Sequence, residues 1–147
     1  MKAIFALLLM CFSTLSFAVE QAEEIFKQLA PSLYQIRLID KASGEKSSIG
    51  SGFQISSDGL IATNYHVISG FARHPHKYTI EYLDNKGNKS ALTLKSVDVI
   101  NDLAIVQREV STEMPYFHIA KQAPTKGEEL FSLGNPHDLG MIVVPGT

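Results

Sequence analysis

From Ser32 onward the pattern of apolar and polar residues changes to a period of two, which is typical of strands. Six short alternating or apolar runs, separated by polar or glycine-containing turns, predict antiparallel strands. The predicted strands cover residues 32–38, 52–55, 60–63, 78–83, 91–97 and 103–107. A polar turn is expected over residues 40–48, and glycine-containing turns over 57–59 and 84–88. Such a set of strands favours a closed antiparallel barrel, because closure removes free sheet edges.

A period of about four marks the residues before the first strand. Apolar side chains lie at positions i, i+3, i+4 and i+7 in residues 20–30, and acidic residues fall in the first turn. This pattern predicts a helix that ends at Pro31. After the barrel, residues 109–127 contain two prolines and are typical of a connecting segment. Two further strands are expected at 129–133 and 141–144, with turns at 134–136 and 145–147.

The first eighteen residues have the features of a secretory signal peptide. Lys2 is followed by an apolar stretch, and Ser16 and Ala18 place small residues at the positions that signal peptidase recognises. We expect cleavage after Ala18 and export to the periplasm or out of the cell. The apolar stretch is shorter than the roughly 20 residues that a membrane-spanning helix needs. A lipoprotein signal ending at Cys11 is disfavoured because Met10 is not small.

Composition narrows the candidate chemistry of the mature chain. Cys11 is the one cysteine and lies in the predicted signal, so the mature chain has no disulfide, thiol nucleophile or cysteine-ligated metal. Removing residues 1–18 removes one of 13 basic residues and none of the 15 acidic ones, which leaves a net charge of −3. The sequence has no cluster of basic residues, so a nucleic-acid partner is not expected. The organisation we expect is a signal peptide (1–18), a helix (19–31), a barrel (32–110), a linker (111–127) and the start of a second β unit (128–147).

His66 and Asp102 are the strongest candidates for catalysis. His66 follows a predicted strand, and Asp102 immediately precedes the apolar run of residues 103–106. A general base must be held firmly while one ring nitrogen stays open, and a carboxylate can fix its tautomer. We expect that apolar run to carry the Asp102 carboxylate toward the barrel interior. The alternatives are a turn histidine, an aspartate in an ordinary turn, and Asp98 as the partner.

Other polar residues are weaker candidates. His74 and His76, together with His66, could bind zinc, but Pro75 constrains the pair and an exposed loop is favoured. Ser51 lies between glycines, yet a Gly-x-Ser-x-Gly nucleophile elbow requires a following helix, and here a strand follows. His118 and His137 are isolated in the sequence. We therefore predict no metal and no cofactor.

Several segments occur in the order found in a known family. They are Gly50-Ser51-Gly52-Phe53, Ser57-Asp58-Gly59, Thr63-Asn64-Tyr65-His66-Val67, Asp102-Leu103-Ala104 and Leu133-Gly134-Asn135-Pro136. Each motif is modest alone, but their order and spacing together are distinctive. From about Phe26 to its last residue, the chain resembles trypsin-like (chymotrypsin-fold) serine proteases of the bacterial HtrA/Deg type.

This resemblance implies an all-β fold: the first six-stranded antiparallel barrel of a trypsin-like double barrel, with an N-terminal helix and the first strands of a second barrel. It implies His66 as general base and then acid, and Asp102 as its orienting partner. The nucleophilic serine of the family lies in a Gly-Asn-Ser-Gly-Gly segment, which also supplies the oxyanion hole. No such segment occurs in these 147 residues, so we expect the chain alone to be inactive.

The function that we expect from the resemblance is hydrolysis of polypeptide substrates by an exported serine endopeptidase. Formation of a homo-oligomer is a further expectation from the family. The main alternative is a trypsin-like binding or scaffold module that has lost catalysis. A secreted metal-binding domain that uses the histidines is a weaker alternative.

Overall fold

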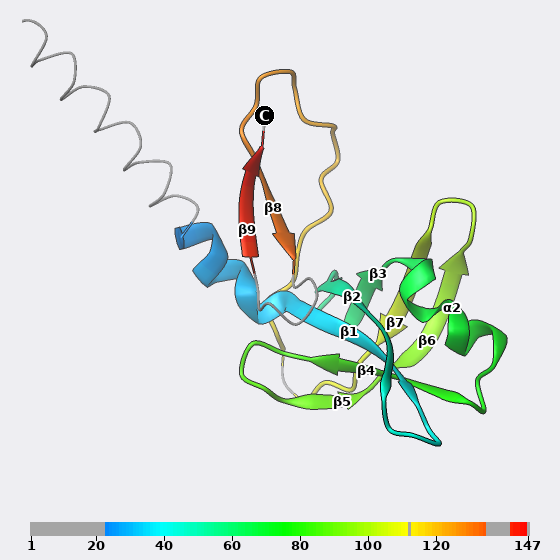
Figure 1. The fold of residues 1–147 in the computed structure, drawn as a ribbon. Helices are drawn as coiled ribbons and strands as arrows, with labels where there is room; N and C mark the ends of the chain where they lie inside the picture. Colours follow the sequence, from blue (N-terminus) through cyan, green and yellow to red (C-terminus); the bar gives the residue numbers. More distant parts are fainter. Residues whose placement is uncertain (1–22, 112, 135–141, 147) are drawn as a thin grey trace, which may run out of the picture.

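A computed structural model describes residues 23–111, 113–134 and 142–146 (Figure 1). Residues 23–29 form an α-helix, and a 3-10 turn, η1 (Ala30–Ser32), follows it directly. The predicted helix is therefore confirmed where the chain is described. It does not end at Pro31, because this proline lies within the 3-10 turn that continues the helix. Proline is compatible with this place because the first N–H groups of a helix have no partner inside the helix. The predicted signal peptide lies outside the described residues.

The centre of the molecule is a curled antiparallel sheet. Its strand order is β5-β4-β1-β2-β3-β7-β6. The strands are β1 (Leu33–Asp40), β2 (Lys46–Gln54), β3 (Leu60–Thr63), β4 (Tyr78–Leu83), β5 (Lys89–Ala91), β6 (Thr93–Asp98) and β7 (Leu103–Gln107). Leu92 alone separates β5 from β6, and its N–H donates to the Ile80 carbonyl at 2.8 Å. One continuous stretch of chain thus supplies both end strands of the sheet, which confirms the predicted all-β barrel architecture.

Three details of this sheet differ from the prediction. The predicted strand at 91–97 is two strands, β5 and β6, because the chain changes its pairing partner at Leu92. β2 begins at Lys46, inside the expected polar turn, because its first, exposed residues continue the backbone pairing with β1, where Lys46 pairs with Ile39. A helix, α2 (Tyr65–Arg73), follows β3 where no helix was predicted.

The hydrophobic core lies between the sheet and α2. Side chains from four strands and from the helix are buried together: Tyr34, Ile36, Leu38, Ile61, Val67, Ile68, Ile80, Tyr82, Ala104 and Val106. Glycine allows α2 to approach the sheet closely. A Cβ on Gly50 would collide with Val67, and one on Gly70 would lie 2.7 Å from Leu38. Tight packing of this kind fixes the position of the helix on the sheet.

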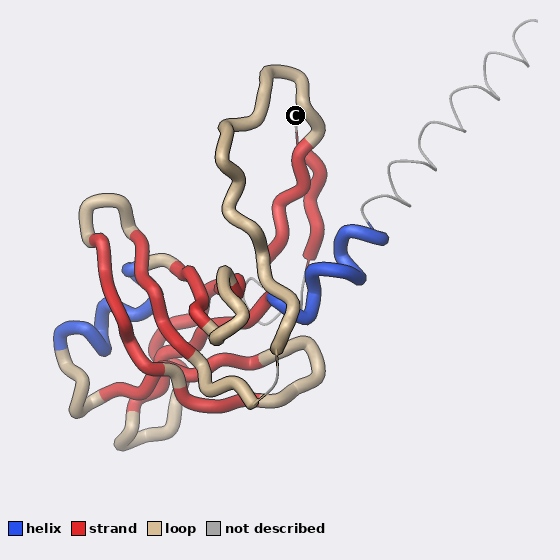
Figure 2. The backbone as a smooth tube through the Cα atoms, turned by 180° about the vertical axis from the view of Figure 1, so that it is seen from behind, coloured by secondary structure: helices blue, strands red, loops and turns tan. Residues whose placement is uncertain are grey.

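A second, smaller sheet is formed near the end of the chain. β8 (Leu130–Gly134) pairs with β9 (Ile142–Gly146) in antiparallel register. Both figures of the backbone show this pair standing apart from the curled sheet (Figure 2). The strand at 129–133 is confirmed, whereas the turn expected over 145–147 is wrong, since Pro145 and Gly146 belong to β9. Proline is tolerated in a strand whose N–H side carries no ladder bond. Most of the turn expected at 134–136 lies outside the described residues.

The connecting segment runs back along the barrel. The Ser32 hydroxyl donates to the Pro115 carbonyl at 2.7 Å, and the Phe117 N–H donates to the Gln54 carbonyl at 2.8 Å. The described part of this segment contains no helix and no strand between β7 and β8, as predicted. Within the described ranges, no helix combines the length and the apolar character that a membrane crossing requires.

Candidate active site

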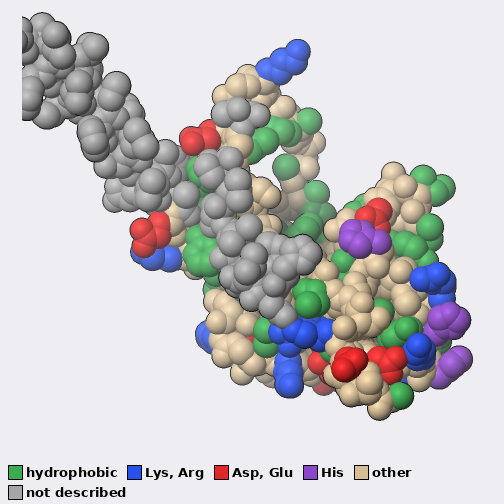
Figure 3. Space-filling view, viewed as in Figure 1, with side chains coloured by type: hydrophobic (Ala, Val, Ile, Leu, Met, Phe, Trp, Pro, Cys, Tyr) green, Lys and Arg blue, Asp and Glu red, His purple; other side chains and the backbone are tan. Residues whose placement is uncertain are grey.

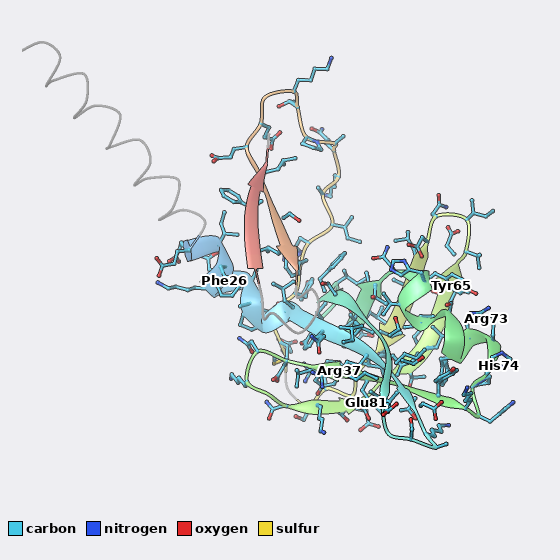
Figure 4. The ribbon with its side chains drawn as sticks, in the orientation of Figure 1. Phe26, Arg37, Tyr65, Arg73, His74 and Glu81 are labelled. Atoms are coloured by element: carbon cyan, nitrogen blue, oxygen red, sulfur yellow. The ribbon has the colours of Figure 1, made fainter. Side chains whose placement is uncertain are left out.

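His66 is held by a helix and not by the end of a strand. β3 ends at Thr63, Asn64 occupies the N-cap position, and His66 is the second residue of α2. The next two residues, Val67 and Ile68, are buried in the core, so the backbone of His66 is tied to the sheet. Figure 4 shows Tyr65 at this first turn of α2, with Arg73 and His74 at the opposite end of the helix.

Asp102 closes the turn that joins β6 to β7. Its φ angle is +53°, a left-handed conformation that aspartate and asparagine adopt more readily than most residues. The Asp98 carboxylate shapes the same turn: it accepts the Asn101 backbone N–H at 3.0 Å and the Asn101 side-chain amide at 2.7 Å. Asp98, the rival candidate, is thus engaged within the turn, and Asp102 is the carboxylate that reaches His66.

The two candidate side chains are in direct contact. His66 Nδ1 lies 2.6 Å from Asp102 Oδ2, and the His66 backbone N–H donates to Asp102 Oδ1 at 2.8 Å. The Tyr65 N–H donates to the Asp102 carbonyl at 3.1 Å. The first N–H groups of a helix have no hydrogen-bond partner within the helix. Asp102, which lies on another element, accepts hydrogen bonds from two of these groups in α2. One carboxylate therefore caps α2 and holds the imidazole ring.

These contacts favour the ionised form of the acid. The hydrogen bond with the His66 side chain, followed by the one from the His66 backbone N–H, holds the pKa of Asp102 below its ordinary value. A carboxylate that stays charged at neutral pH can accept the Nδ1–H hydrogen and stabilise a protonated imidazole.

The position of Asp102 corrects one expectation. Its side chain is 44% exposed, and that of His66 is 69% exposed, so the carboxylate does not enter the barrel interior. The reason is local: Asp102 belongs to the turn, its left-handed backbone directs the carboxylate toward α2, and Ala104 and Val106 are the buried residues of β7. An exposed pair relies on hydrogen bonds for its orientation, because water screens its charges.

The structure places the other candidates away from this pair. Ser51 lies inside β2, and its carbonyl accepts the Thr63 hydroxyl at 2.8 Å, so it is not a nucleophile elbow. His74 and His76 are exposed beyond the far end of α2, and the His118 ring packs on Tyr116 with centroids 4.7 Å apart. His137 is outside the described residues.

Charged side chains of both signs are interspersed over the barrel face in Figure 3. Among the described residues, no group of three or more histidine, cysteine, aspartate or glutamate side chains is arranged to hold a metal ion.

Sequence reasoning missed one member of the site. The Asn64 side-chain amide donates to the Asp102 carbonyl at 3.1 Å and to Asp102 Oδ2 at 3.3 Å. The signal was present in the sequence, since asparagine is a preferred residue immediately before a helix. It became visible only with α2, which the short and glycine-interrupted apolar pattern of residues 65–73 does not predict.

Comparison with known proteins assigns the chain to a family. Residues 50–147 match the trypsin-like peptidase domain. Mouse serine protease HTRA4 is 32% identical over 127 residues, which cover 83% of this chain and 25% of the relative. Human serine protease HTRA4 is 28% identical over 127 residues, again 25% of its length. The chain thus spans about a quarter of the curated relatives it matches.

Solved structures give the same result for the fold. The serine endoprotease from Yersinia pestis matches with a TM-score of 0.71 and 25% identity, over 85% of this chain and 43% of that one. Deg5 matches with a TM-score of 0.70 and 26% identity, over 86% of this chain and 62% of that one. The chain belongs to the trypsin-like peptidase domain family, and its relatives are serine proteases of the HtrA/Deg type.

Proposed function

We propose that this chain carries the His–Asp half of the catalytic machinery of an exported serine endopeptidase. The observation that supports this proposal is the 2.6 Å contact between His66 Nδ1 and Asp102 Oδ2. In such a machinery Asp102 keeps the hydrogen on Nδ1, so the lone pair of Nε2 is free to take a proton. The exposure of the imidazole leaves Nε2 accessible to a serine hydroxyl.

The reaction that we propose is hydrolysis of peptide bonds in polypeptide substrates. A serine hydroxyl would attack the carbonyl carbon while His66 Nε2 takes its proton, and His66 would then pass that proton to the leaving amine, which leaves an acyl-enzyme. Water would next attack the acyl carbon while His66 takes its proton, and His66 would return that proton to the serine as the acid product leaves. Asp102 would stay ionised and stabilise the imidazolium that forms during each half of the reaction. No metal or cofactor takes part in this scheme.

The nucleophile of the scheme is a serine outside these 147 residues. The sequence contains no Gly-Asn-Ser-Gly-Gly segment, which in the family supplies both the serine and the N–H groups that bind the oxyanion. Removing one oxyanion donor alone costs on the order of a hundredfold to a thousandfold in rate. We therefore propose that the 147-residue chain by itself is inactive. Export after cleavage behind Ala18, and assembly into a homo-oligomer, are parts of the same proposal.

The test compares variants of the complete protein that the gene encodes. Casein hydrolysis should fall by at least about a thousandfold in His66→Ala, because the residual rate would come from binding and the oxyanion hole alone. His74→Ala is the matched control, since this histidine lies at the other end of the same helix, and it should keep the wild-type rate. A His66→Ala protein that hydrolyses casein at a near-normal rate would contradict the proposal.

A serine-directed fluorophosphonate probe gives a second, independent measurement. It should label the complete protein at one serine and leave the 147-residue chain unlabelled. Labelling of the short chain at Ser51 would contradict the assignment of Ser51 to a structural strand position.

A further inference from the structure

Asn64 makes contacts that its place in the fold does not require. It occupies the N-cap position of α2, where an asparagine side chain usually accepts an N–H from the first turn, yet it makes no such bond. Its side-chain amide reaches across to the β6–β7 turn and donates to two atoms of Asp102, the carbonyl oxygen and Oδ2. The capping is done by Asp102 itself, which accepts the N–H groups of Tyr65 and His66.

These two contacts bear directly on the candidate pair. Asp102 Oδ2 is the oxygen that also meets His66 Nδ1. One NH2 group bridges the backbone and the carboxylate of the same residue, so it restricts rotation of the Asp102 side chain. We propose that Asn64 is a positioning residue that holds the Asp102 carboxylate in the orientation at which it accepts the Nδ1–H hydrogen of His66. This inference rests on the proposed peptidase function.

Electrostatics gives a reason for an amide at this place. The two hydrogen bonds and the charge of His66 lower the pKa of Asp102 most, and the hydrogen bond from Asn64 is the smallest of the interactions that hold this pKa below its ordinary value. A lysine or arginine would do the same but would repel the imidazolium that forms during the reaction. The amide is a neutral donor, so it supports the ionised acid and leaves the charge for His66.

Replacing Asn64 by aspartate separates this role from helix capping. Aspartate and asparagine are about equally good N-cap residues, so a residue that only supports α2 would tolerate Asn64→Asp. A residue that donates to Asp102 would not, because the change replaces the donor by a carboxylate about 3 Å from Asp102 Oδ2. Asn64→Ala removes the donor without adding a charge.

Asn88 offers a matched control elsewhere in the chain. Its side-chain amide donates to Asp84 Oδ2 at 2.9 Å in the β4–β5 turn. Asn88→Asp therefore creates the same aspartate pair at a distant turn. It reports any general cost of such a pair without touching the candidate site.

The experiment is a titration of the Asp102 side chain by carbon-13 NMR in the 147-residue chain, with the signal assigned through its loss in Asp102→Asn. The Asp102 pKa should rise in Asn64→Ala and rise further in Asn64→Asp, and it should stay at the wild-type value in Asn88→Asp. Circular dichroism at pH 7 checks that each variant is folded. An Asp102 pKa that is unchanged in both Asn64 variants would overturn the inference.

Turnover of the complete protein completes the test. Loss of a hydrogen bond to a charged group corresponds to about a tenfold fall or more, so we expect kcat/KM to fall about tenfold in Asn64→Ala and further in Asn64→Asp. Wild-type kcat/KM in Asn64→Ala would overturn the inference while the proposed function stands. A complete wild-type protein without peptidase activity would overturn the proposed function, and that result does not depend on the titration.

Discussion

Two neighbouring regions of α2 differ sharply in how they are held. Val67 and Ile68 are 2% and 0% exposed and belong to the hydrophobic core between the helix and the sheet. His66, one residue earlier, has a side chain that is 69% exposed and is held by Asp102 alone among its described side-chain contacts. Apolar packing thus fixes where the helix lies, and hydrogen bonds fix where the imidazole points. Stability and the candidate chemistry therefore reside in different residues, and mutation can separate them.

The largest expected loss of stability comes from removing a buried apolar side chain of α2. Ile68→Ala removes a fully buried side chain and leaves a cavity under α2, which should lower the free energy of unfolding by about 2–5 kcal/mol. Ile100→Ala is the matched control, because Ile100 is 95% exposed and its truncation should change the free energy by less than about 0.5 kcal/mol. Urea denaturation measures both. Equal losses in the two variants would show that packing under α2 does not anchor the helix.

A smaller loss of stability is expected when the Asp102 carboxylate is removed, and this loss depends on pH. The folded-state pKa of Asp102 is below its ordinary value, so the stability from its ionised form is present above about pH 4 and is lost as the pH falls through the folded-state value. Urea denaturation should therefore find Asp102→Asn less stable than wild type at pH 5, and the difference should shrink at pH 3. A difference that stays constant between these pH values would contradict the assigned role of the carboxylate in holding α2.

The fold was largely predictable because strand periodicity is a local property. The run at 78–83 alternates, the runs at 60–63 and 103–107 are short and almost entirely apolar, and each is a strand of the curled sheet. α2 was not predictable in the same way. Its buried side chains, Val67 and Ile68, cover only part of one turn, and Gly70 interrupts the pattern. The reason for that glycine is tertiary, since the helix approaches Leu38 there.

The sequence indicated which two residues form the candidate site, but it did not indicate how exposed they are or which residue supports them. His66 and Asp102 stand out by residue type and by their place beside apolar runs, and the structure brings them together. The apolar run after Asp102 suggested burial, whereas the left-handed turn at φ +53° leaves the carboxylate half-exposed. A backbone angle of this kind has no signature in the hydrophobic pattern. The role of Asn64 was hidden for a similar reason, because it depends on two turns that meet across the end of the sheet.

The most direct test of the account concerns the ring hydrogen of His66. Nitrogen-15 NMR of the neutral imidazole, at a pH above its titration, shows which of the two ring nitrogens carries the hydrogen. If Asp102 holds the ring as the 2.6 Å contact indicates, the hydrogen is on Nδ1 in the wild-type chain, and this preference is lost in Asp102→Ala. A wild-type His66 that carries its hydrogen mainly on Nε2 would contradict the account.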